Sequence, residues 1–418
     1  MESLRFLDPE TAESIRTDFG SPAFVYHEAY LLAQAKAALS FPNAFGLTVR
    51  YAMKACPNAA ILRLFDQAGL SIDASSGHEV ARAMRAGVGT EKISLSTQEL
   101  PEDFASLVED GVKINLCSLS QLERYAERFP NTSVGLRFNP GLGSGGTAKT
   151  NVGGPSSSFG IWKDDLDRAR SLAAGANLSI ERIHTHIGSG SDPEVWKRVA
   201  LLSLDLAEAF PQVNTVNLGG GFKVARIAGE TGTDLQLVGE PVKRAFEDFA
   251  ERNSRSLQLE IEPGTFLVAN AGALVATIQD ITSTGPEGNT FLKLDSGMTE
   301  ILRPSLYGAQ HPIVTLPKEV SGNETFPYVV VGHCCESGDL LTPAENQPDV
   351  LAPRELALSQ VGDLCVIEGV GAYCSAMSAK NYNSFPESPE VLLRTDGSTS
   401  LIRKRQTLDQ IMENEILP

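Results

Sequence analysis

The strongest constraint on the fold is a regular alternation of short apolar runs with amphipathic segments through the first two thirds of the chain. Eight runs are typical of buried strands because they are short, rich in β-branched or apolar residues, and bounded by turn-forming residues. Helical patterns lie between them, for example over residues 193–210. The predicted strands begin at Leu47, Ser71, Lys92, Ile114, Ser133, Glu181, Thr215 and Leu257.

Eight strand–helix units in about 250 residues are what a (β/α)8 TIM-type barrel requires. The competing fold is a doubly wound open sheet, whose first strand–helix turn commonly carries the pattern GxGxxG. No such pattern follows the first predicted strand, which ends in YAMKACPN. We therefore predict a barrel over residues 28–271.

Beyond Ala271 the pattern changes, because predicted strands now follow one another without intervening helices. Turn-rich segments such as GPEGN and VSGNET separate these strands. The sequence predicts an antiparallel β domain, sandwich-like or barrel-like, built from residues 1–27 and 272–418. A short helix is expected near the C-terminus, where RQTLDQIMENE begins with a capping signal.

Charge and cysteine usage exclude several classes of partner. The chain has 35 Lys and Arg against 52 Asp and Glu, a formal net charge of −17, which disfavours nucleic acid and anionic membrane surfaces. No apolar run approaches the length of a membrane span. The six cysteines form no CxxC pair, so we expect no metal site and a reduced, cytoplasmic protein.

Four polar features fall at the C-terminal ends of predicted strands, where a barrel of this type places its active site. They are Lys54, His186, the triplet Gly219–Gly221, and Glu262. Taken singly, each is more often a solvated lysine, a structural histidine, a turn or a strand end. Together they suit an aldehyde cofactor with a phosphate, such as pyridoxal phosphate. The lysine would form an imine, the glycine N–H groups would bind phosphate, and the carboxylate would face a pyridine nitrogen.

The chain also resembles a known family through motifs that run in family order over nearly its whole length. The motif string resembles the ornithine/diaminopimelate/arginine decarboxylases, whose barrel is shared with alanine racemase. Within the family, the segments from Leu294 and Cys335 look like the diaminopimelate branch, which releases lysine and CO2. The motifs are YAMKACPN, HTHIGSG, NLGGGF, EIEPGTFLVANAG, LDSGMTEILRPSLYGAQHPI, CESGD and GAYCSAMSAKNYN.

The resemblance implies roles for individual residues. Lys54 matches the Schiff-base lysine, His186 the imidazole stacked on the cofactor, and Cys335 the acid that returns a proton to Cα. Glu262 matches the partner of the pyridine nitrogen. The remaining positions match contacts to the cofactor (Asp73, Arg137, Ser189, Gly219, Gly220, Gly221, Gly264 and Tyr373) or to the substrate (Thr265, Arg303, Tyr307, Glu336 and Tyr373). The family also implies a homodimer with active sites shared between subunits.

One departure bears on the substrate. The family's EPGR segment reads EPGT, so Thr265 stands where an arginine normally contacts the ligand. A threonine donates one neutral hydrogen bond and cannot form a bidentate ion pair. Another cation would have to compensate, with Lys149, Lys223 and Arg226 as candidates. Residues 141–158 also lack the family's usual threonine-glycine-leucine run.

These departures leave a rival function open, a sibling decarboxylase acting on another substrate with a distal carboxylate. A racemase is disfavoured because Glu262 occupies the position that is typically an arginine in racemases. A catalytically inactive homologue is disfavoured because Lys54, His186, Glu262 and Cys335 are all retained.

Overall fold

The structure is a computed structural model, which describes residues 2–142, 153–186, 188, 190–318 and 324–418. The chain divides into two compact units. One comprises residues 32–224 and 231–267, and the other comprises residues 1–31, 225–230 and 268–418. We call the first the barrel unit and the second the β unit, and each is described by itself.

The barrel unit contains a closed ring of eight parallel strands, in the order β2-β3-β4-β5-β6-β8-β9-β10. The pairing of β10 with β2 closes the ring. These are the eight strands expected from the sequence, so the predicted barrel is confirmed. Their bounds are β2 Leu47–Ala52, β3 Ser71–Ala74, β4 Ile93–Ser96, β5 Lys113–Leu116, β6 Ser133–Asn139, β8 Ser179–Thr185, β9 Thr215–Asn217 and β10 Gln258–Ile261.

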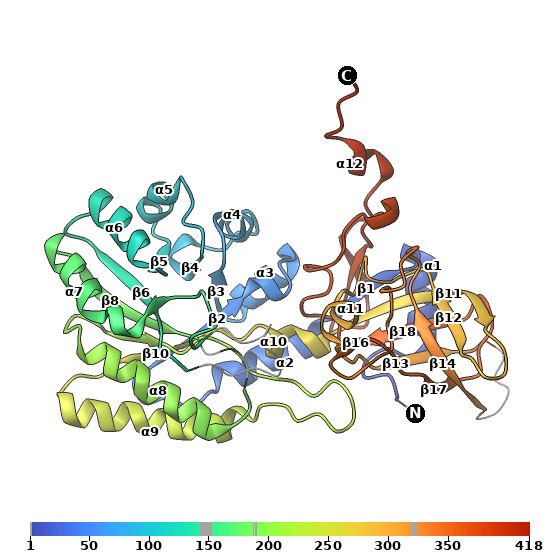
Figure 1. The fold of residues 1–418 in the computed structure, drawn as a ribbon, viewed down its shortest axis with the longest axis horizontal. Helices are drawn as coiled ribbons and strands as arrows, with labels where there is room; N and C mark the ends of the chain where they lie inside the picture. The colour runs from blue at the N-terminus through green and yellow to red at the C-terminus, as the bar shows by residue number, and fades with distance from the viewer. Residues whose placement is uncertain (1, 143–152, 187, 189, 319–323) are drawn as a thin grey trace. The chain divides into compact units, whose positions relative to one another are not determined.

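Helices cover the outside of this ring, as Figure 1 shows for α4 to α9. The short strand β7 (Ile161–Trp162) extends β6, and η1 (Met53–Ala55) follows β2. The helices are α2 Glu28–Leu39, α3 Ala59–Gln67, α4 Gly77–Arg85, α5 Phe104–Glu109, α6 Leu119–Arg128, α7 Leu166–Gly175, α8 Pro193–Glu208, α9 Leu235–Asn253 and α10 Thr265–Val268.

Local signals set where these helices begin. Asn58 caps α3 by accepting from the N–H of Ala60, and Asp192 caps α8 directly before Pro193. In α6 the cap is Ser118, whose side chain accepts from the N–H of Gln121. Strand ends and helix starts are therefore fixed by short-range contacts that the sequence displays.

The β unit is built on a nine-stranded sheet in the order β17-β14-β12-β11-β1-β19-β20, with β18 pairing β11 and β13. Most pairs are antiparallel, as predicted, but β1–β19 and β12–β14 are parallel. The strands of this sheet are β1 Ala23–His27, β11 Gly272–Ser283, β12 Thr290–Leu294, β13 Ile313–Leu316, β14 Thr325–Val331, β17 Arg354–Ala357, β18 Leu364–Glu368, β19 Glu390–Leu393 and β20 Thr399–Arg403. Strands β15 (Pro343–Ala344) and β16 (Gln347–Leu351) pair with each other in a separate two-stranded sheet.

Three helices belong to this unit: α1 (Pro9–Phe19), α11 (Arg303–Tyr307) and α12 (Leu408–Met412). Ala12 and Ile15 of α1 pack into a core with residues of β1, β11 and β18. Thr407 and Gln410 form a reciprocal capping box at the start of α12, so the predicted short helix is confirmed.

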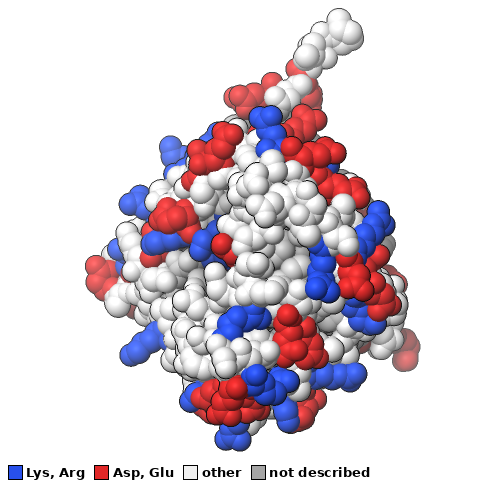
Figure 2. Space-filling view, turned by 90° about the vertical axis from the view of Figure 1, so that its left-hand side faces the viewer, with Lys and Arg blue, Asp and Glu red and all other residues white. Residues whose placement is uncertain are grey.

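Figure 2 shows acidic and basic side chains interspersed over the face it draws. Among the described residues, no helix is both long enough and apolar enough to cross a membrane. In that same part of the chain, no group of three or more His, Cys, Asp or Glu residues is arranged to hold a metal ion.

Candidate active site

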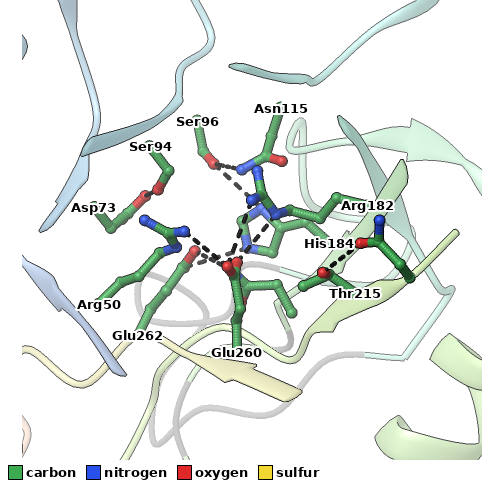
Figure 3. Close-up of polar contacts among 12 residues, drawn as sticks. Arg50, Asp73, Ser94, Ser96, Asn115, Arg182, His184, Thr215, Glu260 and Glu262 are labelled. Carbon is green, nitrogen blue, oxygen red and sulfur yellow. Dashed lines mark hydrogen bonds and ion pairs between the residues drawn. The ribbon is translucent and has the colours of Figure 1, made fainter. Parts of the chain in front are cut away.

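Polar side chains from neighbouring strands converge inside the barrel towards the ends of β8, β9 and β10 (Figure 3). Glu262 follows the last residue of β10 and is buried. Asn217, the last residue of β9, donates to Glu262 Oε1 over 2.7 Å. His184 of β8 places Nε2 at 3.3 Å from Glu262 Oε2. A carboxylate from one strand thus meets donors from the next two strands of the ring.

The proton arrangement of His184 is fixed by a chain of hydrogen bonds. Asn115 donates to Ser96 Oγ over 2.9 Å, which leaves the Ser96 hydroxyl to donate to His184 Nδ1 at 3.2 Å. His184 then holds its hydrogen on Nε2, facing Glu262. Burial lowers the pKa of His184. A neutral ring therefore lies beside the carboxylate, with Nε2 at 3.3 Å from Glu262 Oε2.

Glu262 is ionised despite its surroundings. Burial alone would raise the pKa of this carboxyl, but its contact with His184 and the positive charge of Arg137 hold it well below its usual range. Asn217 adds a donor that favours the charged form. The rim of the barrel therefore presents a fixed negative charge.

Asp73, at the end of β3, behaves in the opposite way. Burial raises its pKa well above the usual value, and the negative charge of Glu262 raises it further. Ser94 Oγ lies 3.3 Å from Asp73 Oδ1, and the positive charge of Lys54 partly offsets the shift. Two carboxyl groups in one barrel thus differ in charge because their neighbours differ.

Lys54 and His186 belong to the same group of charged and polar side chains as Asp73 and Glu262. Lys54 is an exposed residue of η1, directly after β2, and its charge acts on Asp73 and His186. His186 follows β8; burial and then the charge of Arg137 lower its pKa well below the usual value. His186 Nδ1 is buried and has no protein partner among the described residues. A neutral imidazole at the rim is available to contact a ligand.

The glycine triplet allows close approach. A side chain on Gly219, whose φ is +71°, would lie 2.7 Å from the His186 ring, and one on Gly220 would lie 2.2 Å from the Glu262 carbonyl oxygen. The turn is tied down because Gly219 N donates to Asn217 Oδ1 over 2.8 Å. Here only glycine permits the backbone to lie beside both functional residues. Bare backbone N–H groups at such a turn suit a phosphate.

The remaining predicted cofactor contacts in this unit have definite positions. Arg137 is a buried residue of β6, and its guanidinium carbon lies 5.1 Å from the centre of the Phe159 ring. A side chain on Gly264 would lie 3.3 Å from the Cβ atoms of Ala52 and Ala55. Thr265 begins α10. Ser189 lies outside the described residues, and so does Lys149.

One level below this rim, a buried ion triad forms the floor of the site (Figure 3). Arg50 Nη2 lies 2.7 Å from Glu260 Oε1, and Arg182 Nε lies 3.1 Å from Glu260 Oε2. Asn217 also donates to Glu260 over 3.3 Å. Burial acts to raise the pKa of Glu260, but the two arginines hold it below the usual value.

Sequence reasoning missed this floor, together with His184 and Asn217. The spacing of the residues in the sequence indicates part of this arrangement. His184 and His186 alternate along one strand and so face the same side, as do Glu260 and Glu262. The partners of these residues come from distant strands, which periodicity alone does not reveal.

The other predicted residues belong to the β unit. Arg303 and Tyr307 begin and end α11, with the Arg303 guanidinium carbon 6.0 Å from the Tyr307 ring centre. Tyr373 is held at φ +56°, an unusual backbone conformation for a bulky residue. Such strain persists where surrounding structure fixes it, and it is common at functional sites.

Cys335 and Glu336 lie exposed on a loop that Asp339 organises. Asp339 accepts from the N–H groups of Met298 at 2.7 Å and Cys334 at 2.8 Å. Cys335 N in turn donates to Asn383 Oδ1 over 2.9 Å. The backbone that carries the Cys335 thiol is therefore held by hydrogen bonds to both Asp339 and Asn383.

The barrel rim thus combines a lysine, an ionised carboxylate, a neutral imidazole and a glycine turn. This set fits a ring cofactor that carries an aldehyde, a basic nitrogen and a phosphate. The unpartnered His186 nitrogen and the glycine turn, where a Cβ has no room, are the observations behind that fit. Fold and site together define a barrel enzyme that uses pyridoxal phosphate.

Comparison with known proteins agrees. Residues 32–269 match the family model described as pyridoxal-dependent decarboxylase, pyridoxal binding domain. The chain is 33% identical to diaminopimelate decarboxylase of Escherichia coli K12, covering 98% of this chain and 97% of that protein. A crystal structure of a diaminopimelate decarboxylase is 32% identical, with a TM-score of 0.91 and 99% of each chain covered. Another, from M. jannaschii in complex with L-lysine, is 26% identical with a TM-score of 0.85, covering 97% of this chain and 94% of that one. The chain belongs to the pyridoxal-dependent decarboxylases.

Proposed function

We propose that this decarboxylase converts meso-2,6-diaminopimelate into L-lysine and CO2, in the last step of lysine formation. The observation behind this choice is full-length similarity to diaminopimelate decarboxylases, which extends over both units of the chain. None of the six cysteines, all of which the structure describes, forms a disulfide, which suits the reducing cytoplasm that we propose as its location.

The barrel unit would hold the cofactor. Pyridoxal phosphate, when bound, supplies a protonated ring that accepts the electron pair of the breaking Cα–carboxylate bond. Lys54 would bind its aldehyde carbon, and His186 would cover one face of its ring. The N–H groups of Gly219, Gly220 and Gly221, with Ser189 and the backbone at Gly264, would hold the phosphate. Asp73, Arg137 and Tyr373 complete the proposed contacts.

Glu262 has the decisive electrostatic role in this proposal. Because its carboxylate stays ionised, it would hold a proton on the ring nitrogen. A cation at that place would weaken the protonated ring, which is why Glu262 favours decarboxylation over racemisation. The hydrogen bond from Asn217 and the contact with His184 would fix the direction in which Glu262 points.

The β unit would supply the acid and the substrate contacts. Cys335 would deliver a proton to Cα after CO2 leaves, from a loop ordered by Asp339. Arg303, Tyr307, Glu336 and Tyr373 would bind the distal amino-acid group of the substrate, and Thr265 of the barrel unit would add a neutral hydrogen bond. A cation, phenols and an anion around a zwitterion are chemically complementary.

One assay tests the function. The protein loaded with pyridoxal phosphate should release CO2 and lysine from meso-diaminopimelate, and borohydride should fix the cofactor on Lys54. Lys54→Ala should abolish turnover, with a circular-dichroism spectrum that matches the parent. The second candidate is a decarboxylase for another substrate with a distal carboxylate, and Thr265 is the observation that favours it. Turnover of such a substrate with none of diaminopimelate would decide for the second candidate.

We also propose a homodimer in which Cys335 and Glu336 of one subunit complete the barrel rim of the other. A two-fold arrangement makes such a contact twice. Mixing inactive Lys54→Ala and Cys335→Ala subunits should then restore about a quarter of parental sites after random exchange, because one site of each mixed dimer receives neither lesion. Activity that stays at the level of the separate variants, once exchange is verified, excludes sharing.

A further inference from the structure

A cationic cluster in the β unit lacks a protein counter-ion. Its members are Arg226, from a loop, and Arg303, from α11, and the neutral ring of His311 precedes β13 near them. Arg226 Nη2, Arg303 Nε and His311 Nε2 are buried atoms without a hydrogen-bond partner among the described residues. Neither guanidinium forms an ion pair with a carboxylate in the part of the chain that the structure describes. The two guanidinium nitrogens are buried donors, and buried donors require an acceptor.

The position of Arg226 is built into the fold. Its Nε donates to the Gly369 carbonyl oxygen over 3.0 Å. A side chain on Gly369 would lie 3.0 Å from Arg226 Cγ, so glycine is needed for the arginine stem to pass. Asn270 donates to the Ala225 carbonyl over 3.0 Å, and Glu230 Oε2 accepts from Arg226 N over 2.6 Å. The segment 225–230 is thereby fixed to the β unit.

Contacts with the backbone of Glu368 and Gly369 link Arg226 to the segment that carries Arg303 and His311. His311 Nδ1 lies 3.1 Å from the carbonyl oxygen of Glu368, the residue before Gly369. Arg303 lies eight positions before His311, and its carbonyl accepts from Ala309 N. Burial and then the charge of Arg303 lower the pKa of Arg226 to about 9. Burial, Arg226 and Arg303 lower the pKa of His311 well below its usual value.

The charged groups facing Arg226 show what is missing. The Glu230 carboxylate accepts from the backbone N–H groups of Arg226 and Ile227. The positive charge of Arg5 also acts on Arg226. Cys374 is a buried thiol, and burial raises its pKa to about 11. Arg226 and Arg303 are thus left without a paired carboxylate among the described residues. Two guanidiniums with unused N–H groups match the geometry of a carboxylate.

We propose that Arg226 joins Arg303 in binding the distal carboxylate of the substrate, and so replaces the arginine that the family places at the position of Thr265. This inference rests on the proposed function. The carboxylate concerned stays on the molecule after CO2 leaves, so it is also the carboxylate of the product lysine. Arg226 is then a determinant of specificity for substrates that end in an amino acid.

The test compares binding of the product with binding of its analogue that lacks a carboxylate. L-Lysine and cadaverine are titrated calorimetrically into the loaded parent enzyme, Arg226→Ala, Arg226→Lys and Lys223→Ala. Arg226→Ala should weaken L-lysine binding about a hundredfold, in line with the loss of a charged partner, and leave cadaverine binding within twofold. Arg226→Lys should recover part of the loss. Lys223→Ala removes the other described candidate cation and should match the parent.

Turnover gives a second readout. Arg226→Ala should raise KM for meso-diaminopimelate about a hundredfold and lower kcat by less than about tenfold, because the lost contact is present before and during reaction. Adding Thr265→Arg to Arg226→Ala should restore at least tenfold of the loss. If Arg226→Ala does not fold, the comparison is made with Arg226→Gln and Arg226→Lys.

Two results would overturn the inference. One is unchanged L-lysine affinity in the Arg226 variants, and the other is an equal loss for L-lysine and cadaverine, which marks a structural role. Failure of the proposed function looks different, because the parent enzyme itself would then release no CO2 from diaminopimelate.

Discussion

Removing the central carboxylate of the barrel floor should destabilise the barrel strongly. Glu260→Gln keeps the size of the side chain but leaves Arg50 and Arg182 without a counter-ion, and Arg50 is only 1% exposed. At the separations of 2.7 and 3.1 Å, the two attractions amount to roughly 6 and roughly 5 kcal/mol at an effective dielectric constant of about 20. Hydration that the arginines regain on unfolding offsets part of this in the parent. We expect a net loss of about 3 to 5 kcal/mol in the free energy of unfolding.

The assay is urea unfolding followed by tryptophan fluorescence. Trp162 and Trp196 are the chain's two tryptophans and both lie in the barrel unit, so the signal reports that unit alone. The matched control is Glu208→Gln, which removes the same charge from an exposed pair with Arg252 at 3.8 Å. That change should cost less than about 1 kcal/mol.

A third variant separates lost pairing from lost packing. Replacing the triad together, as Arg50→Met, Glu260→Leu and Arg182→Met, removes every buried charge of the floor. Such replacements are often neutral or stabilising, so this variant should unfold at the parental urea concentration or above it. If Glu260→Gln alone stayed within about 1 kcal/mol of the parent, the claim that the arginines depend on Glu260 would be refuted.

Three further outcomes are expected. Gly220→Ala should abolish cofactor absorbance, because its Cβ would lie 2.2 Å from the Glu262 carbonyl oxygen; a fully loaded variant would contradict this. Asp339→Asn should lower kcat about tenfold with KM within twofold, since the Cys335 loop loses a charged acceptor of two N–H groups; steady-state kinetics checks both values. Burial raises the pKa of Glu300 from 4.5 to about 7, so its contribution to stability is full below pH 4.5 and falls by about 3 kcal/mol as pH rises to 7. Glu300→Gln should remove that slope, and urea unfolding at pH 4.5 and 7.5 measures it.

The barrel was predictable because its information is local. Each strand is a short apolar run between turn residues, and each helix begins at a recognisable signal. The positions of Lys54, His186 and Glu262 at strand ends follow from the same pattern. The β unit was less accessible, since the parallel pairings β1–β19 and β12–β14 join segments that are distant in sequence or separated by another strand.

The barrel floor could not be predicted for a related reason. Arg50, Arg182 and Glu260 are charged residues on strands, which periodicity assigns to a solvated face. They are buried because each finds an opposite charge on a strand one or two places away in the ring, and that pairing exists only after closure. The cationic cluster around Arg226 is similar, because residues 225–230 leave the barrel unit and join the β unit.

Asn217 shows how the floor and the site depend on one another. Its amide nitrogen donates to Glu260 at 3.3 Å and to Glu262 at 2.7 Å, while its oxygen accepts from Gly219 N at 2.8 Å. One side chain at the end of β9 therefore links the ion triad, the ionised carboxylate and the glycine turn. Because the triad fixes Glu260, it also fixes the amide that orients Glu262. The Glu262 charge that the proposed chemistry uses at the rim is thus held in place by charges one layer below.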